Sequence, residues 1–201
     1  SVVVLVHGTW GRASPWHHPS SLVIEELRDL GHEVLTFKWS GVLAGVPTTL
    51  PGDPAHAQVG GDQGDLLPWL DAGEKLLLFL EVNHLERPSV VSHSHGLQVV
   101  AFSCWAGATY ETALSISGPI RRDMQRARRY ATARIGRWVQ FADPDTDWTI
   151  KEGELFDGAL GESVALPEGD TVLTPGAGHS GLVNDPSLRR RYTPWNALVG
   201  R

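Results

Sequence analysis

The sequence predicts an α/β protein with a mostly parallel sheet and helices on both of its faces. Short β-branched apolar runs alternate with segments of helical periodicity along the chain. The first run, Val2 to Val6, is apolar at every position, as in a parallel strand covered on both sides. The length of 201 residues suits one domain, so we expect residues 1–201 to form a single unit.

The same patterns place the elements in order. Strands are expected at 2–6, 33–39, 90–91, 113–116, 138–142 and 171–174, and helices from Ser20 or Ser21 to Gly31, from Asp65 onward, at 97–105 and at 121–134. The helix after Asp65 should bury Leu66, Leu70, Leu77 and Leu80, and the arginine-rich helix at 121–134 should be a charged outer helix. Residues 42–64 are expected to form a long loop that borders the functional site.

Composition narrows the classes of partner. The net charge of -6 argues against nucleic acid or an anionic membrane surface as the main partner, and small or neutral substrates fit better. No apolar run is long enough to span a bilayer, so no integral membrane segment is expected. One cysteine, Cys104, cannot form an internal disulfide, and no signal peptide is visible, which favours a cytoplasmic location.

Residues 92–96 read Ser-His-Ser-His-Gly between an apolar run and a helix of small apolar residues. A serine on a sharp turn between a strand and a helix needs small residues two positions before and after it, because side chains there collide with neighbouring elements. Gly96 meets this need fully and Ser92 nearly. The pattern therefore predicts a nucleophile elbow with Ser94 as nucleophile.

Three further clusters follow predicted strands, at residues 7–11, 143–147 and 176–181. Because ligands bind beyond the carboxyl ends of parallel strands, we expect these clusters to meet Ser94 at one edge of the sheet. A nucleophilic serine needs a base, a partner that orients the base, and donors for the oxyanion. The clusters supply a candidate for each task.

The chain order Ser94, aspartate, His179 resembles that of the α/β-hydrolases, and the resemblance covers nearly the whole chain. It implies a minimal α/β-hydrolase fold similar to small capless lipases, esterases and cutinases. The sequence departs from the family pattern in Ser92, which stands where a glycine is usual, in the missing earliest strands, and in the short segment from Ser117 to Arg137 where many members insert a cap. Unlike most cutinases, the chain cannot form a disulfide.

The resemblance also implies roles. His179 is expected to act as general base and then general acid, and Asp147 as the triad acid, with Asp143 and Asp145 as alternatives. The backbone N–H of His95 should be one oxyanion donor, and Thr9 or Trp10 should supply the second. His7, Trp39 and Trp148, together with Trp10, are candidates for the wall of an acyl pocket, while His93 and His95 either line the cleft or pack structurally.

These roles predict a serine hydrolase that cleaves small-molecule or lipid esters through an acyl-enzyme intermediate, without a cofactor. An acyltransferase, thioesterase or amidase that uses the same triad remains an alternative, as does a binding module on a degenerate hydrolase scaffold. No metal site is expected, since His17, His18, His56 and His84 have no spacing typical of metal ligands. The sequence leaves the oligomeric state open.

Overall fold

The computed structural model describes residues 1–44, 66–150 and 164–199, and in this part of the chain six parallel strands form one sheet in the order β2-β1-β3-β4-β5-β6. The strands are β1 (Val2–Val6), β2 (Glu33–Phe37), β3 (Ser89–His93), β4 (Tyr110–Ile116), β5 (Ile135–Ala142) and β6 (Asp170–Leu173). The helices are α1 (Leu22–Asp29), α3 (Leu67–Val82), α4 (Gly96–Ala106), α5 (Gln125–Thr132), α7 (Gly181–Asn184) and α8 (Pro186–Tyr192). The predicted fold class is confirmed.

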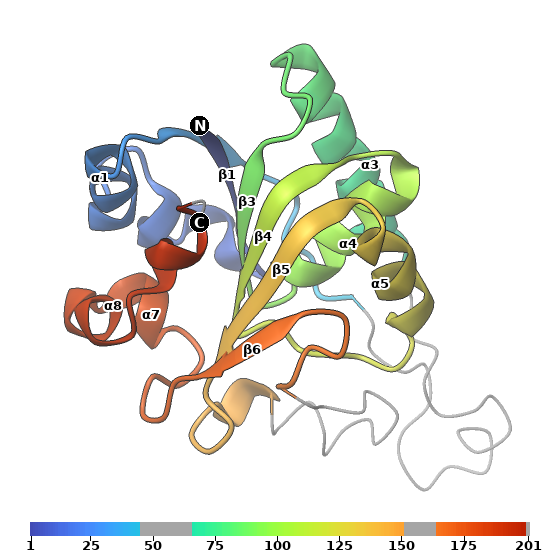
Figure 1. Cartoon of the computed structure of the whole chain (residues 1–201). Helices are drawn as coiled ribbons and strands as arrows, with labels where there is room; N and C mark the ends of the chain where they lie inside the picture. The colour runs from blue at the N-terminus through green and yellow to red at the C-terminus, as the bar shows by residue number, and fades with distance from the viewer. Residues whose placement is uncertain (45–65, 151–163, 200–201) are drawn as a thin grey trace, which may run out of the picture.

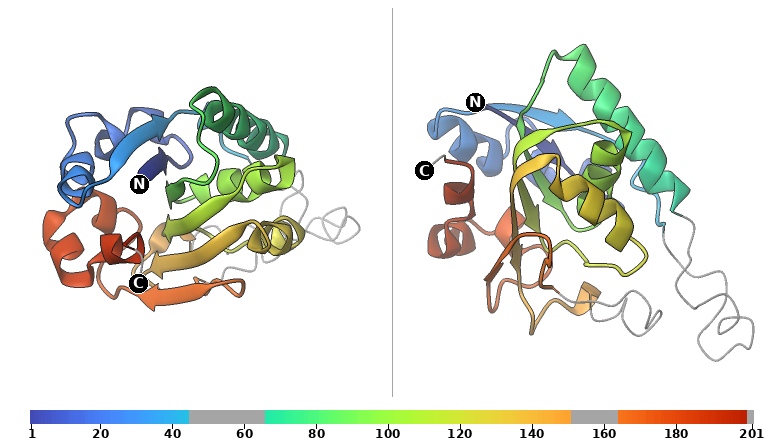
Figure 2. Two further views of the ribbon diagram at one scale, coloured as in Figure 1. Left: turned by 45° about the horizontal axis from the view of Figure 1, so that its top comes forward. Right: turned by 45° about the vertical axis from the view of Figure 1, so that its right-hand side comes forward.

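Helices cover both faces of the sheet (Figures 1 and 2). Along β1, Val4 and Val6 face the layer of α3, α4 and α5, whereas Val3 and Leu5 face the layer of α1, α7 and α8. This alternation explains why β1 has no polar position, since water reaches neither face. Each fully buried aliphatic side chain of this kind contributes about 1.5–3 kcal/mol to folding.

Helix α1 begins and ends where the sequence predicts. The hydroxyl of Ser21 accepts a hydrogen bond from the N–H of Ile24 at 3.2 Å, which satisfies one of the free donors of the first turn. Gly31 follows the helix with a φ of 86°, a conformation that favours glycine. Strand β2 is shorter than expected, because Trp39 leaves the strand pairing and donates its backbone N–H to His7.

The expectation for α3 is only partly met. Leu80 is buried as predicted, and Leu66 and Leu77 are partly buried against the core, but Leu70 is not fully buried. The fully buried positions of the helix are Trp69, Ala72, Gly73, Leu76 and Leu80. A Cβ added at Gly73 would lie 2.6 Å from Cβ of Phe102 on α4, so the two helices approach closely there. Residues 45–64 of the expected loop, and its place beside the site, lie outside the described residues.

The arginine-rich segment is not simply a charged outer helix. The helix in it is shorter than predicted, and Arg121 and Arg128 are buried. Arg121 donates to both carboxylate oxygens of Asp123, and Arg128 pairs with Glu168 at 3.1 Å. Burial is tolerated because each guanidinium is paired, and breaking such a pair is strongly destabilising.

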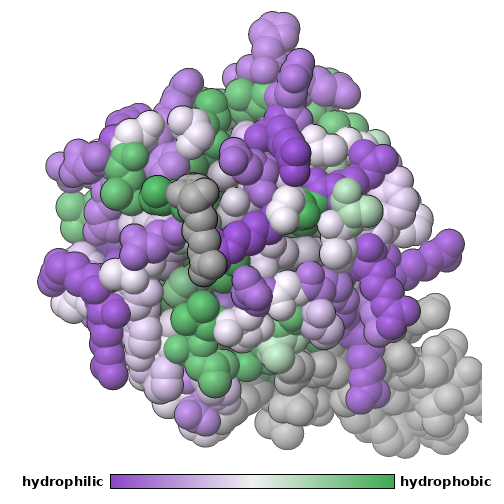
Figure 3. Space-filling model, in the orientation of Figure 1, coloured by the Kyte–Doolittle hydropathy of each residue, from purple (hydrophilic) through white to green (hydrophobic). Residues whose placement is uncertain are grey.

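The C-terminal segment packs against α1. The carboxylate of Glu26 accepts from both Arg189 Nε and Nη2, at 2.7 and 2.9 Å, and from the indole N–H of Trp195. The face seen in Figure 3 is mainly hydrophilic, with apolar residues over the edge strand β6, where Val172 and Leu173 are exposed. No helix of the described residues is long and apolar enough to cross a bilayer.

Candidate active site

Ser94 lies on the sharp turn between β3 and α4 and has a φ of 54°. A non-glycine residue in the left-handed region is uncommon and strained, so the surrounding structure must hold it. The N–H of Ser94 donates to the carbonyl of Ile116 on β4 at 2.9 Å, and its own carbonyl accepts from Leu97 at 3.1 Å. The serine is therefore fixed between the sheet and the first turn of α4, with 8% of its surface exposed.

Two glycines make this turn possible. A Cβ on Gly96 would lie 2.7 Å from the carbonyl oxygen of Val6, and a Cβ on Gly8 would lie 2.7 Å from Cβ of Ser94. Both distances are shorter than nonbonded contacts of a real Cβ allow. The chain at the end of β1 thus approaches Ser94 and the start of α4 so closely that glycine is needed at both positions, as the five-residue pattern predicts for Gly96.

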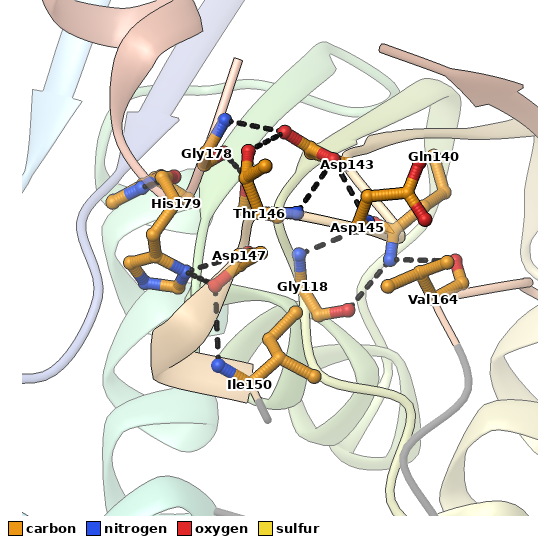
Figure 4. A network of polar contacts seen from close by, with 12 residues as sticks. Gly118, Gln140, Asp143, Asp145, Thr146, Asp147, Ile150, Val164, Gly178 and His179 are labelled. Atoms are coloured by element: carbon orange, nitrogen blue, oxygen red, sulfur yellow. Dashed lines mark hydrogen bonds and ion pairs between the residues drawn. The ribbon is translucent and has the colours of Figure 1, made fainter. Parts of the chain in front are cut away.

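His179 and Asp147 lie in two loops beyond the ends of β6 and β5 and contact each other (Figure 4). Nδ1 of His179 is 3.0 and 2.9 Å from the two carboxylate oxygens of Asp147. Asp147 is 1% exposed and also accepts the N–H of Ile150 at 3.1 Å. Since Nδ1–H donates to the carboxylate, Nε2 of a neutral His179 carries the free lone pair.

His93 links this pair to the serine elbow. Its Nε2–H donates to the backbone carbonyl of His179 at 2.8 Å, and the two rings are 5.0 Å apart. Burial, and then repulsion from a protonated His179, lower the pKa of His93 to about 3, so its ring is neutral near pH 7. Because His93 immediately precedes Ser94, the bond holds His179 beside the elbow. Among the described residues, no hydrogen bond joins the side chains of Ser94 and His179 directly.

The three candidate aspartates differ in their contacts. Asp143 accepts from the N–H groups of Asp145, Thr146 and Gly178 at 2.9, 3.0 and 2.8 Å, and from the Thr146 hydroxyl (Figure 4). Burial alone would raise the pKa of Asp143, but these hydrogen bonds outweigh it and lower the pKa to about 2. Asp145 is exposed. Asp147 is thus the aspartate whose carboxylate reaches His179, while Asp143 joins the loop after β5 to the loop after β6.

The candidate oxyanion donors also differ in their hydrogen bonds. Within residues 1–44, 66–150 and 164–199, the backbone N–H groups of Thr9 and His95 have no hydrogen-bond acceptor. The N–H of Trp10 donates to the carbonyl of Gly41 at 2.7 Å. The N–H of Trp10 is therefore not available as the second oxyanion donor, and the N–H of Thr9 is the remaining candidate.

The expected pocket wall is wrong for two of its members. His7 and Trp39 are buried, and their rings stack nearly parallel with centroids 5.5 Å apart. The indole N–H of Trp39 donates to the His7 carbonyl at 2.7 Å, and the His7 ring accepts from the Trp39 backbone and donates to the carbonyl of Gly8. The two side chains therefore pack in the interior against the loop after β1, and neither is exposed enough to line an open pocket. Trp148, by contrast, is 66% exposed, and Trp10 is exposed as well.

The pKa of His7 follows from this position. Burial lowers it from 6.5 to about 4, against the smaller effect of the hydrogen bond to Gly8, which raises it. His7 is therefore neutral at pH 7. Within the described residues, no group of three or more His, Cys, Asp or Glu side chains is arranged to hold a metal ion.

Two contacts of the site have no counterpart in the sequence analysis. The His93 bond to the His179 carbonyl and a 2.8 Å bond between Thr9 Oγ1 and His95 Nδ1 each join residues 86 positions apart. The histidines that flank Ser94 were visible as candidates, but no spacing along the chain indicates these partners.

No family model and no curated protein sequence matches the chain. Solved structures do. The chain is similar to a predicted CIB-like hydrolase from Thermoplasma acidophilum, with 14% identity and a TM-score of 0.60 over 96% of this chain and 84% of that one. A carboxylesterase structure from Nitrososphaera gargenis has 14% identity and a TM-score of 0.60, over 98% of this chain and 90% of that one. The esterase domain of a Rhodothermus marinus protein has 13% identity and a TM-score of 0.54, over 98% of this chain and 85% of that one. The similarity extends over nearly all of the chain, which has the α/β-hydrolase fold.

Proposed function

We propose that the chain is a serine hydrolase that cleaves carboxylic esters through an acyl-enzyme intermediate. The observation that carries the proposal is the hydrogen-bonded pair of His179 and Asp147, held by His93 beside a serine in a strained turn. This combination of nucleophile, base and orienting acid suits acyl transfer. The similar carboxylesterase and esterase-domain structures support an ester substrate.

The first half of the reaction forms the acyl-enzyme. Ser94 Oγ attacks the ester carbonyl carbon while Nε2 of His179 takes the hydroxyl proton. The backbone N–H groups of Thr9 and His95 bind the oxygen that becomes negatively charged. When the tetrahedral intermediate collapses, the bond from carbon to the alcohol oxygen breaks, and His179 gives its proton to the departing alcohol.

The second half returns the enzyme to its starting state. Water attacks the acyl carbon as His179 takes one of its protons, and collapse breaks the bond to Ser94 and restores its hydroxyl. Asp147 stays charged throughout, fixes the Nδ1–H tautomer and stabilises the imidazolium. The direct bond between Ser94 and His179 forms when substrate binds, because catalytic hydrogen bonds often tighten only in the substrate complex.

The test uses p-nitrophenyl esters of increasing acyl length together with fluorophosphonate labelling located by mass spectrometry. Ser94→Ala should abolish both turnover and labelling, whereas Ser20→Ala, an exposed serine bonded to His18, should leave both unchanged. Preferred chain length would distinguish an esterase from a lipase. Faster transfer to an added alcohol than to water would assign an acyltransferase, and selective cleavage of thioester or amide analogues would assign those activities. Absence of both turnover and labelling would favour a binding module and refute the proposal.

A further inference from the structure

The loop after β1 and the turn after β3 are joined by a bond between side chains. Thr9 Oγ1 lies 2.8 Å from His95 Nδ1, although the two residues are 86 positions apart. Strands β1 and β3 are neighbours in the sheet, with Val6 opposite Ser92, so their ends lie next to each other. The Thr9 side chain spans the gap between these two ends.

The bond connects the two residues whose backbone N–H groups have no acceptor among the described residues. An oxyanion hole acts only when both donors lie about 2.7–3.1 Å from the place the oxyanion will occupy, so their separation matters. We propose that the hydrogen bond between the side chains of Thr9 and His95 sets the separation of the two oxyanion donors and that the two side chains are positioning groups. This inference rests on the proposed serine hydrolase function.

The His95 ring is held on its other side. Its centroid is 4.8 Å from that of Trp69, which is fully buried on α3 and carries the guanidinium of Arg121 at 4.9 Å from its own ring. The ring therefore has little freedom to follow Thr9 if the loop moves. Burial, and then the positive charge of Arg121, lower the pKa of His95 to about 3, so the ring is neutral at working pH.

The rest of the loop is fixed to other elements. Trp10 N–H donates to Gly41, and Gly11 N–H donates to Gly8 within the loop. Among the described hydrogen bonds, the one between Thr9 and His95 is the bond that joins residues 8–11 to residues 94–95. Without it, the Thr9 N–H is free to drift relative to the His95 N–H, while Gly8 stays packed against Ser94.

The experiment removes the bond from each side. Thr9→Val keeps the shape of the side chain without its hydroxyl, and His95→Phe keeps a flat ring against Trp69 without the nitrogen; neither alters a backbone N–H. Each should lower kcat about 10- to 100-fold with little change in KM, because a displaced donor weakens transition-state binding. Affinity for a trifluoromethyl ketone, whose serine adduct carries an oxyanion, should fall by the same factor. Thr9→Ser, which keeps the hydroxyl, should recover most of the lost kcat.

A matched control and a double variant separate positioning from other effects. Thr109→Val makes the same chemical change at the opposite end of the sheet, where the hydroxyl donates to the Glu86 carbonyl, and should leave kcat and ketone affinity unchanged. The double variant Thr9→Val/His95→Phe should be no worse than the more impaired single variant, because both remove one bond. Thermal unfolding of every variant identifies any loss that comes from misfolding.

Three results decide the matter. If the kcat of the double variant falls by the product of the two single-variant factors, the side chains act independently and the proposal is overturned. A normal kcat in a folded Thr9→Val or His95→Phe enzyme also overturns the proposal. If only His95→Phe has a normal kcat, the Thr9 hydroxyl acts without the His95 ring. A wild-type protein that neither hydrolyses esters nor is labelled at Ser94 refutes the proposed function itself, a result that unaffected variants of an active enzyme do not give.

Discussion

The buried histidine His7, at the start of the loop after β1, should make the protein sensitive to mild acid. His7 has a pKa of about 4 in the folded protein, against 6.5 for its ordinary value. Below pH 6.5 the unfolded chain therefore binds a proton that the folded protein does not, and stability present at neutral pH is lost as the pH falls toward 4. Between pH 7.5 and 5, this linkage amounts to about 2 kcal/mol of unfolding free energy.

The perturbation is His7→Gln, whose amide can donate and accept as the ring does but does not titrate. Urea unfolding of both proteins at pH 7.5 and 5.0 gives the loss of stability for each. We expect the wild type to lose about 2 kcal/mol more than the variant over this range. His17, stacked on His7 with ring centroids 5.2 Å apart, has a pKa lowered mainly by burial, and its contribution remains in both proteins.

Equal acid sensitivity of the two proteins would refute this reasoning. An NMR titration of the His7 ring in folded protein is the direct check, and a midpoint near 6.5 would show that burial does not hold the ring neutral.

The remaining predictions concern the site and the packing that supports it. Asp147→Asn should lower kcat about 10³- to 10⁴-fold by releasing the histidine tautomer, whereas Asp145→Asn should retain activity; a reversed order in steady-state kinetics would assign the acid differently. Arg189→Met should reduce the urea unfolding free energy by about 2 kcal/mol, less than for a fully buried pair because Glu26 is partly exposed, and an unchanged value would contradict the role of the pair. Gly96→Ala should cost about 1–3 kcal/mol and lower Tm, since its Cβ would meet the carbonyl at the end of β1; a wild-type Tm would count against this close approach.

Features encoded by neighbouring residues were predictable from the sequence. The apolar run of β1, the Ser21 cap of α1 and the small residues around Ser94 each act within a few positions, so local pattern and steric rules are enough to find them. The parallel order of the strands predicts that their ends meet at one edge, and the resemblance to the α/β-hydrolases then selects His179 and Asp147 as partners, with Asp143 and Asp145 as alternatives; in the structure the His179 ring contacts Asp147.

Features set by distant residues were not predictable. The burial of Arg128 depends on Glu168, 40 positions away, and the charge of an arginine alone favours an exposed site. The buried stripe of α3 is predicted only in part, with Leu80 buried as expected, because helix periodicity does not say which side meets α4, where Gly73 permits a close approach. Trp39 is expected near a pocket because it lies at the carboxyl end of a predicted strand, but its two hydrogen bonds to His7 place it in the interior.

The hydrogen bond from Gly178 to Asp143 has a consequence for protein engineering. It makes residues 143–147 and the segment around 178–179 one mechanical unit, although 30 residues of sequence separate them. A segment grafted from another hydrolase into either loop would meet an unmatched partner in the other. Exchanges between relatives of this fold should therefore transplant both loops together, as a single cassette.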